Sequence, residues 1–138
     1  MRVVESQWWI IDLPDEWEAE QVDDAITIGD EDGVGVIELT TLQKENGKVD
    51  DKELREFTAE IEEQFGAGQE IQVADLSGYY YCYKDGDEAI REWYLRLDDL
   101  LIFIIYSCDE ENAGMDDSSV DEILSTLFIK GEEAEITE

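Results

Sequence analysis

Three strand-like runs between residues 70 and 108 are separated only by short acidic turns, and this arrangement limits the fold more than any other feature of the chain. The runs cover residues 70–84, 87–97 and 100–108, and the breaks between them are Asp85-Gly86 and Asp98-Asp99. Breaks of this length join neighbouring antiparallel strands, and Asp-Gly is a typical hairpin turn. The sequence therefore predicts an antiparallel meander in this half of the chain.

A two-residue turn at Asp85-Gly86 would divide the side chains of the first hairpin between two faces, because successive side chains alternate along a strand. In this register Lys84 lies opposite Asp87, and Tyr81 lies opposite Ile90. The first face is expected to meet the core and carries Tyr80, Cys82, Ala89, Trp93, Leu95 and Leu97. The second face is amphipathic and carries Tyr79, Tyr81, Tyr83, Ile90, Glu92, Tyr94 and Arg96.

The tyrosines of the second face have two interpretations. A turn at Asp98-Asp99 places Leu101, Phe103 and Ile105 beside Tyr94, and so apolar a neighbour indicates that a helix partly covers this face. The tyrosines then form the wall of a sheet, as aromatic residues at strand periodicity usually do. The alternative is an exposed edge that binds a partner protein. That partner-binding edge would consist of Tyr79, Tyr81, Tyr83 and Tyr94.

Outside the meander, the sequence predicts three strands and two helices. Residues 7–13 form one strand that ends before Pro14, and residues 25–42 form two strands joined by the acidic turn at 29–33. A helix is expected from Asp50 to Gly66, with apolar positions at Leu54, Phe57, Ile61 and Phe65. A capping box of Ser119 and Glu122 predicts a last helix. Its apolar positions are Val120, Ile123, Leu124, Leu127 and Phe128.

These elements predict one α+β domain over residues 1–131, followed by an acidic tail over residues 132–138. No internal repeat or linker divides the chain. The expected architecture is a mainly antiparallel sheet of six to seven strands with helices packed on it.

The chain resembles, in the order of its elements over nearly its whole length, the PsbP-like superfamily, which includes the PsbP extrinsic subunit of photosystem II and the Ran-binding nuclear import factor. The matching features are an apolar strand, a Pro-x-x-Trp turn from Pro14 to Trp17, and a strand pair around the Gly-rich acidic turn from Gly29 to Gly35. The resemblance implies an α/β/α sandwich used for protein binding, without a shared catalytic site. It does not extend to photosystem or Ran functions, since the chain has no recognisable signature for those partners.

Charge narrows the classes of partner. The chain has 39 acidic and 9 basic residues, for a formal net charge of -30. Such a field repels phosphate groups and anionic lipids, so the charge argues against direct nucleic-acid binding and against binding to an anionic membrane surface. Two interpretations of the charge are open. It is either a solvated surface suited to high ionic strength or a complement to a basic partner protein.

The sequence predicts no catalytic, cofactor or metal site. It has no histidine, no Gly-x-Ser-x-Gly elbow and no phosphate-binding glycine loop. The acidic turns at residues 30–33 and 85–87 do not fit the spacing of an EF-hand loop. Carboxylate pairs such as Glu62/Glu63 and Asp116/Asp117 are expected at this acidic content and carry little information. Cys82 and Cys108 are expected to be reduced, slowly reacting core residues.

The sequence thus favours a non-enzymatic, cytoplasmic protein-binding module. The start of the chain has neither the pattern of a signal peptide nor a span of about 20 apolar residues. One alternative is an acidic immunity protein or inhibitor that masks a basic toxin or a nucleic-acid-binding protein. A third, more distant alternative is a hydrolase that uses paired carboxylates in a cleft.

Overall fold

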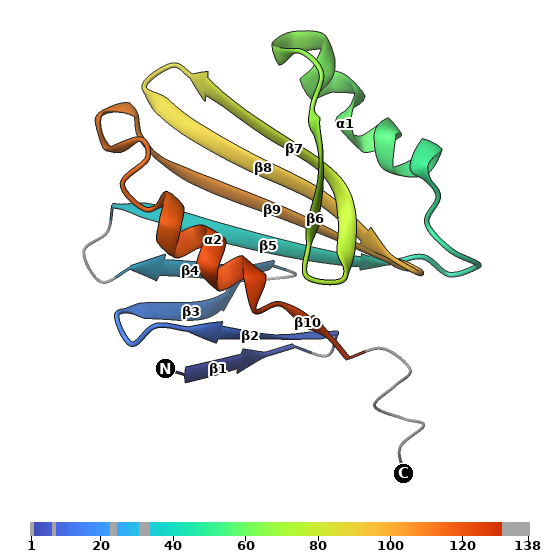
Figure 1. Ribbon diagram of the computed structural model, residues 1–138, viewed down its shortest axis with the longest axis horizontal. Helices are drawn as coiled ribbons and strands as arrows, with labels where there is room; N and C mark the ends of the chain where they lie inside the picture. The colour runs from blue at the N-terminus through green and yellow to red at the C-terminus, as the bar shows by residue number, and fades with distance from the viewer. Residues whose placement is uncertain (1, 7, 23–24, 31–33, 131–138) are drawn as a thin grey trace.

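Seven strands form the main sheet of the computed structural model, which describes residues 2–6, 8–22, 25–30 and 34–130 (Figure 1). The strand order is β3-β4-β5-β9-β8-β7-β6, and every pairing is antiparallel. The strands are β3 (Trp17–Val22), β4 (Ala25–Asp30), β5 (Gly35–Gln43), β6 (Gln69–Val73), β7 (Leu76–Asp85), β8 (Glu88–Leu97) and β9 (Leu100–Asp109). The predicted α+β class with a mainly antiparallel sheet is confirmed.

A second, three-stranded sheet was not expected from the sequence. It consists of β1 (Arg2–Glu5), β2 (Trp9–Leu13) and β10 (Phe128–Ile129), in the order β1-β2-β10. The main sheet agrees with the predicted six to seven strands, and the three strands of the small sheet are additional to that prediction. The sequence predicts residues 70–84 as one run, but they contain most of β6, a turn at Ala74-Asp75 and most of β7.

Two apolar clusters lie on opposite faces of the main sheet. On one face, side chains of β2 and of α2 (Asp117–Ser125) pack with Trp93, Ile102 and Ile104. On the other face, Leu54 of α1 (Asp51–Phe65) packs with Tyr79, Tyr81 and Leu101. The short 3-10 helix η1 (Glu110–Asn112) follows β9. The main sheet is thus the middle layer, with α1 on one side and α2 with the small sheet on the other.

The register of the central hairpin differs from the expected one by two residues. Asp85 pairs with Glu88, so Gly86 and Asp87 form the turn, and Tyr81 lies opposite Glu92. Gly86 has a φ of 63°, a conformation that favours glycine and therefore fixes the turn one position later than expected. Because the shift is an even number of residues, every side chain stays on its predicted face.

Both predicted helices are present, but only the first begins where the sequence predicted. Asp50 accepts a hydrogen bond from the backbone of Glu53 (2.8 Å), and the Glu53 side chain accepts one from the Asp50 backbone (3.1 Å). The second helix begins at Asp117, so the capping box predicted at Ser119 and Glu122 is wrong. Val120 N–H already donates to the backbone oxygen of Asp116 (2.8 Å), which places Ser119 inside the helix.

Two sequence predictions lie outside the described residues: the tip of the acidic turn at 31–33 and the tail at 132–138. The Pro-x-x-Trp turn is described, and Trp17 N–H donates to the Pro14 oxygen (3.0 Å). Within the described ranges, no helix has the length and apolar character needed to cross a membrane.

Candidate functional site

The four tyrosines singled out from the sequence lie on one face of the β7–β8 hairpin, and α1 packs over this face. Tyr81 is 4% exposed, Tyr79 is buried, and Tyr83 and Tyr94 are half-buried. The prediction that a helix partly covers this face is confirmed. Gly68, just before β6, lies so close to the Tyr81 ring that a Cβ there would approach it to 2.4 Å. Tyr79 and Tyr81 thus have little surface free, and a role of the four tyrosines in partner binding stays a prediction.

Each of these tyrosine hydroxyls donates a hydrogen bond to a carboxylate. Tyr79 donates to Asp51 (2.5 Å) and Tyr81 donates to Glu62 (2.5 Å), and both acceptors belong to α1. Tyr94 donates to Glu92 (2.5 Å), and Tyr83 donates to the other oxygen of the same carboxylate. Glu92 is only 6% exposed, so these two hydroxyls supply the hydrogen bonds that a buried carboxylate requires. The hydroxyls of Tyr79 and Tyr81 therefore fasten α1 to the sheet, whereas those of Tyr83 and Tyr94 form hydrogen bonds within the sheet.

Burial and these hydrogen bonds raise the pKa of the tyrosines. Burial, followed by the bond to Glu62, raises the pKa of Tyr81 to about 12. Burial, followed by the bonds to Glu92, raises the pKa of Tyr83 and Tyr94. The hydrogen bond to Asp51 raises the pKa of Tyr79. The phenols are consequently neutral donors near pH 7, with no tendency to act as nucleophiles or bases.

Aromatic rings continue from the tyrosine face to the surface along α1. Phe65 stacks on Tyr83 with ring centroids 4.0 Å apart, and Phe57 packs against Phe103 at 5.0 Å. Phe57 is nevertheless 46% exposed and Phe65 is 40% exposed. These two side chains form the rim of the α1 interface and not its centre, which is Leu54.

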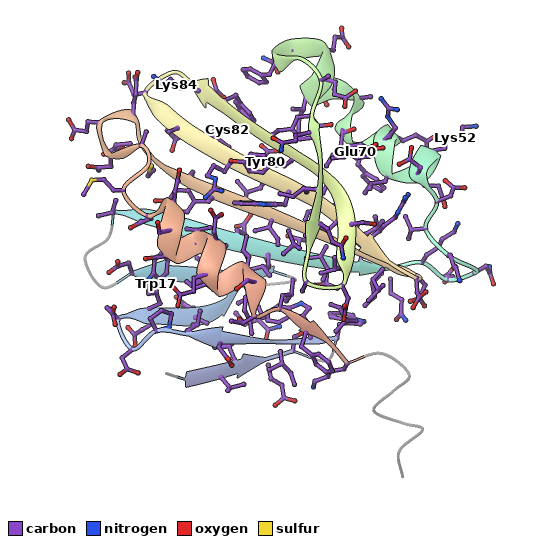
Figure 2. All side chains as sticks on the ribbon, viewed as in Figure 1. Trp17, Lys52, Glu70, Tyr80, Cys82 and Lys84 are labelled. Carbon is purple, nitrogen blue, oxygen red and sulfur yellow. The ribbon has the colours of Figure 1, made fainter. Side chains whose placement is uncertain are left out.

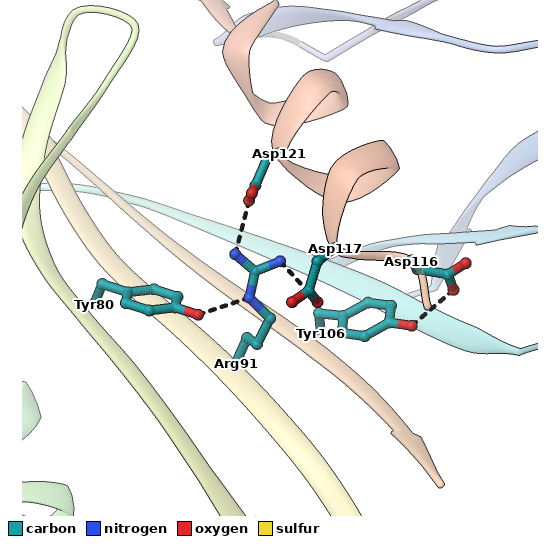
Figure 3. A network of polar contacts seen from close by, with 6 residues as sticks. All are labelled: Tyr80, Arg91, Tyr106, Asp116, Asp117 and Asp121. Atoms are coloured by element: carbon teal, nitrogen blue, oxygen red, sulfur yellow. Dashed lines mark hydrogen bonds and ion pairs between the residues drawn. The ribbon is translucent and has the colours of Figure 1, made fainter. Parts of the chain in front are cut away.

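The opposite face of the hairpin contains an arginine cluster that the sequence reasoning missed (Figure 3). Arg91 Nε donates to the Tyr80 hydroxyl (2.7 Å), and its Nη2 donates to Asp121 of α2 (2.7 Å). Its Nη1 contacts Asp117 at 3.4 Å, and the guanidinium lies 4.7 Å from the Trp93 ring centroid. Burial alone would lower the pKa of Arg91, but the bonds to Tyr80 and Asp121 outweigh it and raise the pKa. The sequence signal that could have indicated this cluster is the position of Arg91 on the otherwise apolar face of β8.

Cys82 is exposed, so the prediction that it faces the core is wrong, whereas Cys108 is buried as expected. Cys82 is on the predicted face of β7, opposite Arg91. On that face the core reaches Ala89 of β8 and Cys108 of β9, but along β7 it ends at Tyr80. Figure 2 places Cys82 toward the turn end of β7, between Tyr80 and Lys84.

A pocket of about 390 Å³ opens between β6, β7 and the start of α1. Its polar lining consists of Asp51, Glu70, Gln72, Ser77, Tyr79 and Arg96. Arg96 Nη2 lies 3.7 Å from Asp51, which also accepts the hydrogen bond from Tyr79. Glu70 points from β6 toward the side of α1 (Figure 2). Sequence reasoning did not find this pocket, because β6 was not recognised as a separate strand.

The carboxylate pairs considered for catalysis do not converge on a cleft. Glu62 accepts the hydrogen bond of Tyr81, and Asp116 accepts one from Tyr106 (2.7 Å; Figure 3). Asp117 contacts Arg91, so three of the four carboxylates are already engaged by the fold. In the part of the chain that the structure describes, no group of three or more Cys, Asp or Glu side chains is placed to hold a metal ion.

Comparison with known proteins shows a likeness of fold alone. No protein-family model matches the sequence, and no curated protein matches it significantly. A crystal structure from Bacteroides thetaiotaomicron VPI-5482, determined at 1.50 Å resolution, has a similar fold, with a TM-score of 0.69 and 11% sequence identity. The match covers 91% of this chain and 46% of the Bacteroides chain, so this chain spans less than half the length of that protein.

Proposed function

We propose that the chain is a non-enzymatic protein-binding module whose acidic surface binds a basic partner protein. The observation that carries the proposal is that most of its few Lys and Arg side chains are already paired with carboxylates of the same chain. Of the eight Lys and Arg side chains that the structure describes, seven form ion pairs with carboxylates of the same chain. They are Lys44, Lys48, Arg55, Lys84, Arg91, Arg96 and Lys130.

Internal pairing of the cations leaves the excess of carboxylates facing solvent. The pairs of Arg91 and Arg96 hold α2 and α1 to the sheet, so these guanidinium groups are not free to screen the outer surface. A basic protein approaching this surface is attracted over several ångströms, and the attraction increases the rate of association. Binding of this kind is sensitive to salt, because ions screen exposed charges.

The immunity-protein hypothesis is a special case of the same proposal. If the partner is a basic toxin or a nucleic-acid-binding protein, the module masks the cationic surface that the partner needs for its own target. The PsbP-like relationship also remains a proposal. It is supported by the position of the main sheet between α1 on one side and α2 on the other. The small sheet beside α2 lies outside that expectation.

The proposal is tested by capture from native cytosol on the immobilised chain at about 0.05 M and about 0.5 M NaCl, with identification of the bound proteins. The expected result is a basic protein that binds in the low-salt buffer and is released in the high-salt buffer. Recovery of only neutral or acidic proteins, or retention unaffected by salt, would contradict the proposal. A matched control is the chain with Glu56, Glu60 and Glu63 replaced by Gln, which lowers the charge of α1 without removing an ion pair described above.

A further inference from the structure

The edge of the main sheet at β6 is open. β6 pairs with β7 on one side, and within the described residues no backbone hydrogen bond joins residues 69–73 to another segment. Gln69, Glu70 and Gln72 are exposed. An open strand edge presents unpaired N–H and C=O groups, which another extended chain is able to pair with.

The polar pocket described above lies directly beside this open edge. Glu70 and Gln72 are two residues apart on β6, so both side chains project from the same face, the one that faces the pocket. Gln72 Nε2 donates to the Ala74 oxygen (3.2 Å), which leaves its amide oxygen as an acceptor. Glu70 and Ser77 have no hydrogen-bond or ion-pair partner among the described residues. The pocket thus offers three unused acceptor groups in a row.

The charge of the pocket favours a cation. Asp51 is paired with Arg96, at 3.7 Å, so these two charges largely offset each other. Among the lining carboxylates, Glu70 is then the one without an ion-pair or hydrogen-bond partner in the described residues, and the rest of the chain adds a strong negative field. A guanidinium or ammonium group fits this combination of one carboxylate with neighbouring neutral acceptors. A volume of about 390 Å³ is sufficient for one long side chain.

We propose that an extended segment of the basic partner binds along the open edge of β6 and places a Lys or Arg side chain in the pocket against Glu70. The proposal rests on the proposed function and names the surface that would carry it. A second copy of this chain fits poorly on the same edge, since each copy has a formal charge of -30 and would bring its own Glu70 to the contact. A segment with a cationic side chain at every second position matches the alternation of β6.

The test uses the capped peptide Thr-Arg-Thr-Arg-Thr and the ¹H–¹⁵N spectrum of the full chain in about 0.15 M NaCl, where the Debye length is about 8 Å. The expected result is saturable shifts of the amide signals of residues 69–73 and 77–79. Two peptide controls separate the contributions. Citrulline in place of arginine removes the charge, and N-methylation of alternate amides removes strand pairing, so both should abolish the shifts.

A pair of charge-matched variants tests the role of the pocket. Glu70→Gln should weaken peptide binding by about fivefold, the upper range for a partly exposed ion pair. Glu88→Gln removes the same charge at the opposite end of β7 and β8, next to the Gly86-Asp87 turn, and should leave affinity within about 1.5-fold of the original.

Several outcomes would overturn the inference. These are shifts spread over all acidic surfaces, equal binding of the N-methylated peptide, or equal affinities of the two variants. Sedimentation that shows a dimer through β6 without peptide would make a second copy the occupant and would also overturn it. A deca-arginine peptide distinguishes this failure from that of the broader function. If the chain binds deca-arginine and its basic partner without involving β6, the inference fails and the proposed function stands. If it binds neither, both fail.

Discussion

Tyrosine hydroxyls replace scarce cations as hydrogen-bond donors to carboxylates in this protein. Asp51, Glu62, Glu92 and Asp116 all accept hydrogen bonds from tyrosine. The chain has 9 basic residues for 39 acidic ones, so ion pairs alone are too few for the carboxylates that lie against the sheet. A phenol satisfies a carboxylate and also adds a large apolar ring to the core. The tyrosine-rich segment therefore has a structural explanation.

Tyr81 gives a direct test of this explanation. Tyr81→Ala should lower the free energy of unfolding by about 3 to 5 kcal/mol, because removal of a buried aromatic ring leaves a cavity. Tyr81→Phe keeps the ring and should cost about 1 kcal/mol, through the lost hydrogen bond to Glu62. Urea denaturation of the three proteins measures both values. A loss under about 1 kcal/mol for Tyr81→Ala would contradict the buried position.

The two cysteines should differ in reactivity. Cys82 is exposed and Cys108 is buried in the core cluster, so a thiol reagent is expected to modify Cys82 in the folded protein and to reach Cys108 only on unfolding. Labelling with an aromatic disulfide reagent, followed by mass spectrometry, measures the two rates. In the control variant Cys82→Ser the rapid phase should disappear. If the rapid phase persists in that variant, Cys108 is accessible and its assignment to the core is wrong.

The raised pKa values predict loss of stability in alkaline solution. The pKa of every tyrosine is raised, that of Tyr81 to about 12, from the reference value of 10.0. The folded state thus holds protons that the unfolded state releases near pH 10. This contribution to stability is complete below pH 10 and is lost as the pH rises through the folded pKa values. Absorbance of tyrosinate should remain low at pH 10 in the folded chain but reach half its maximum in urea, and equal absorbance would contradict the raised pKa values.

At the scale of elements, the sequence predicted best where periodicity and turn residues agree. The strands 87–97 and 100–108 and the helix after Asp50 have both signals, and the structure has β8, β9 and α1 there. β1 has only four residues, and in β3 the alternation of Trp17 and Ala19 with glutamates breaks at Gln21, so both patterns are short. The turn between β6 and β7 uses Ala74 with a φ of 54°, a conformation that usually selects glycine or asparagine.

The same limits explain what was found and missed at the candidate sites. Alternation places each hairpin side chain on its correct face, and the apolar strand beside Tyr94 correctly indicated a covering helix. Alternation does not show how far along a strand the cover extends, and this is why Cys82 was assigned to the core. The β6 pocket was missed because β6 and β7 are separated by a turn that begins with Ala74, which is not a typical turn residue. The Arg91 cluster was missed because its carboxylates belong to α2, about 30 residues away in the chain.

The observed helix starts predict different effects of replacing Asp50, which caps α1, and Ser119, which lies inside α2. Asp50→Ala should destabilise the protein by about 1 kcal/mol, because Asp50 caps α1 through the backbone of Glu53. Ser119→Ala should stay within about 0.5 kcal/mol of the original protein, since Ser119 lies inside α2 and caps no helix. Thermal melts of both variants measure the difference. A larger loss for Ser119→Ala than for Asp50→Ala would show that α2 begins at the predicted capping box after all.

At the scale of the whole molecule, the three-layer arrangement stabilises the fold against repulsion among the excess carboxylates. Each apolar cluster lies between the main sheet and a covering layer. The covering layer is α1 for one cluster, and α2 with the small sheet for the other. Arg91 and Arg96, two of the few cations, lie at the junctions between the helices and the main sheet. The carboxylates that cannot be paired are left on the outside. Core packing thus stabilises the fold against a self-repulsion that no internal contact removes.

This balance predicts that salt stabilises the protein. The Debye length is about 30 Å at 0.01 M salt, comparable to the size of a small domain, and about 3 Å at 1 M, so added salt removes most of the repulsion among the excess carboxylates. Salt also weakens the ion pairs, but exposed pairs contribute only about 0 to 1 kcal/mol each, and few cations are present. The midpoint of thermal unfolding should therefore rise between these two NaCl concentrations.

A control variant separates charge screening from a general effect of salt on apolar burial. In the chain with Glu60, Glu88 and Glu122 replaced by Gln, three exposed charges are absent and the net charge is smaller, so the rise in midpoint should also be smaller. The variant should in addition be more stable than the original chain in the low-salt buffer and approach it in the high-salt buffer. An unchanged or lower midpoint of the original chain at 1 M NaCl would show that ion pairs, and not self-repulsion, dominate its electrostatics.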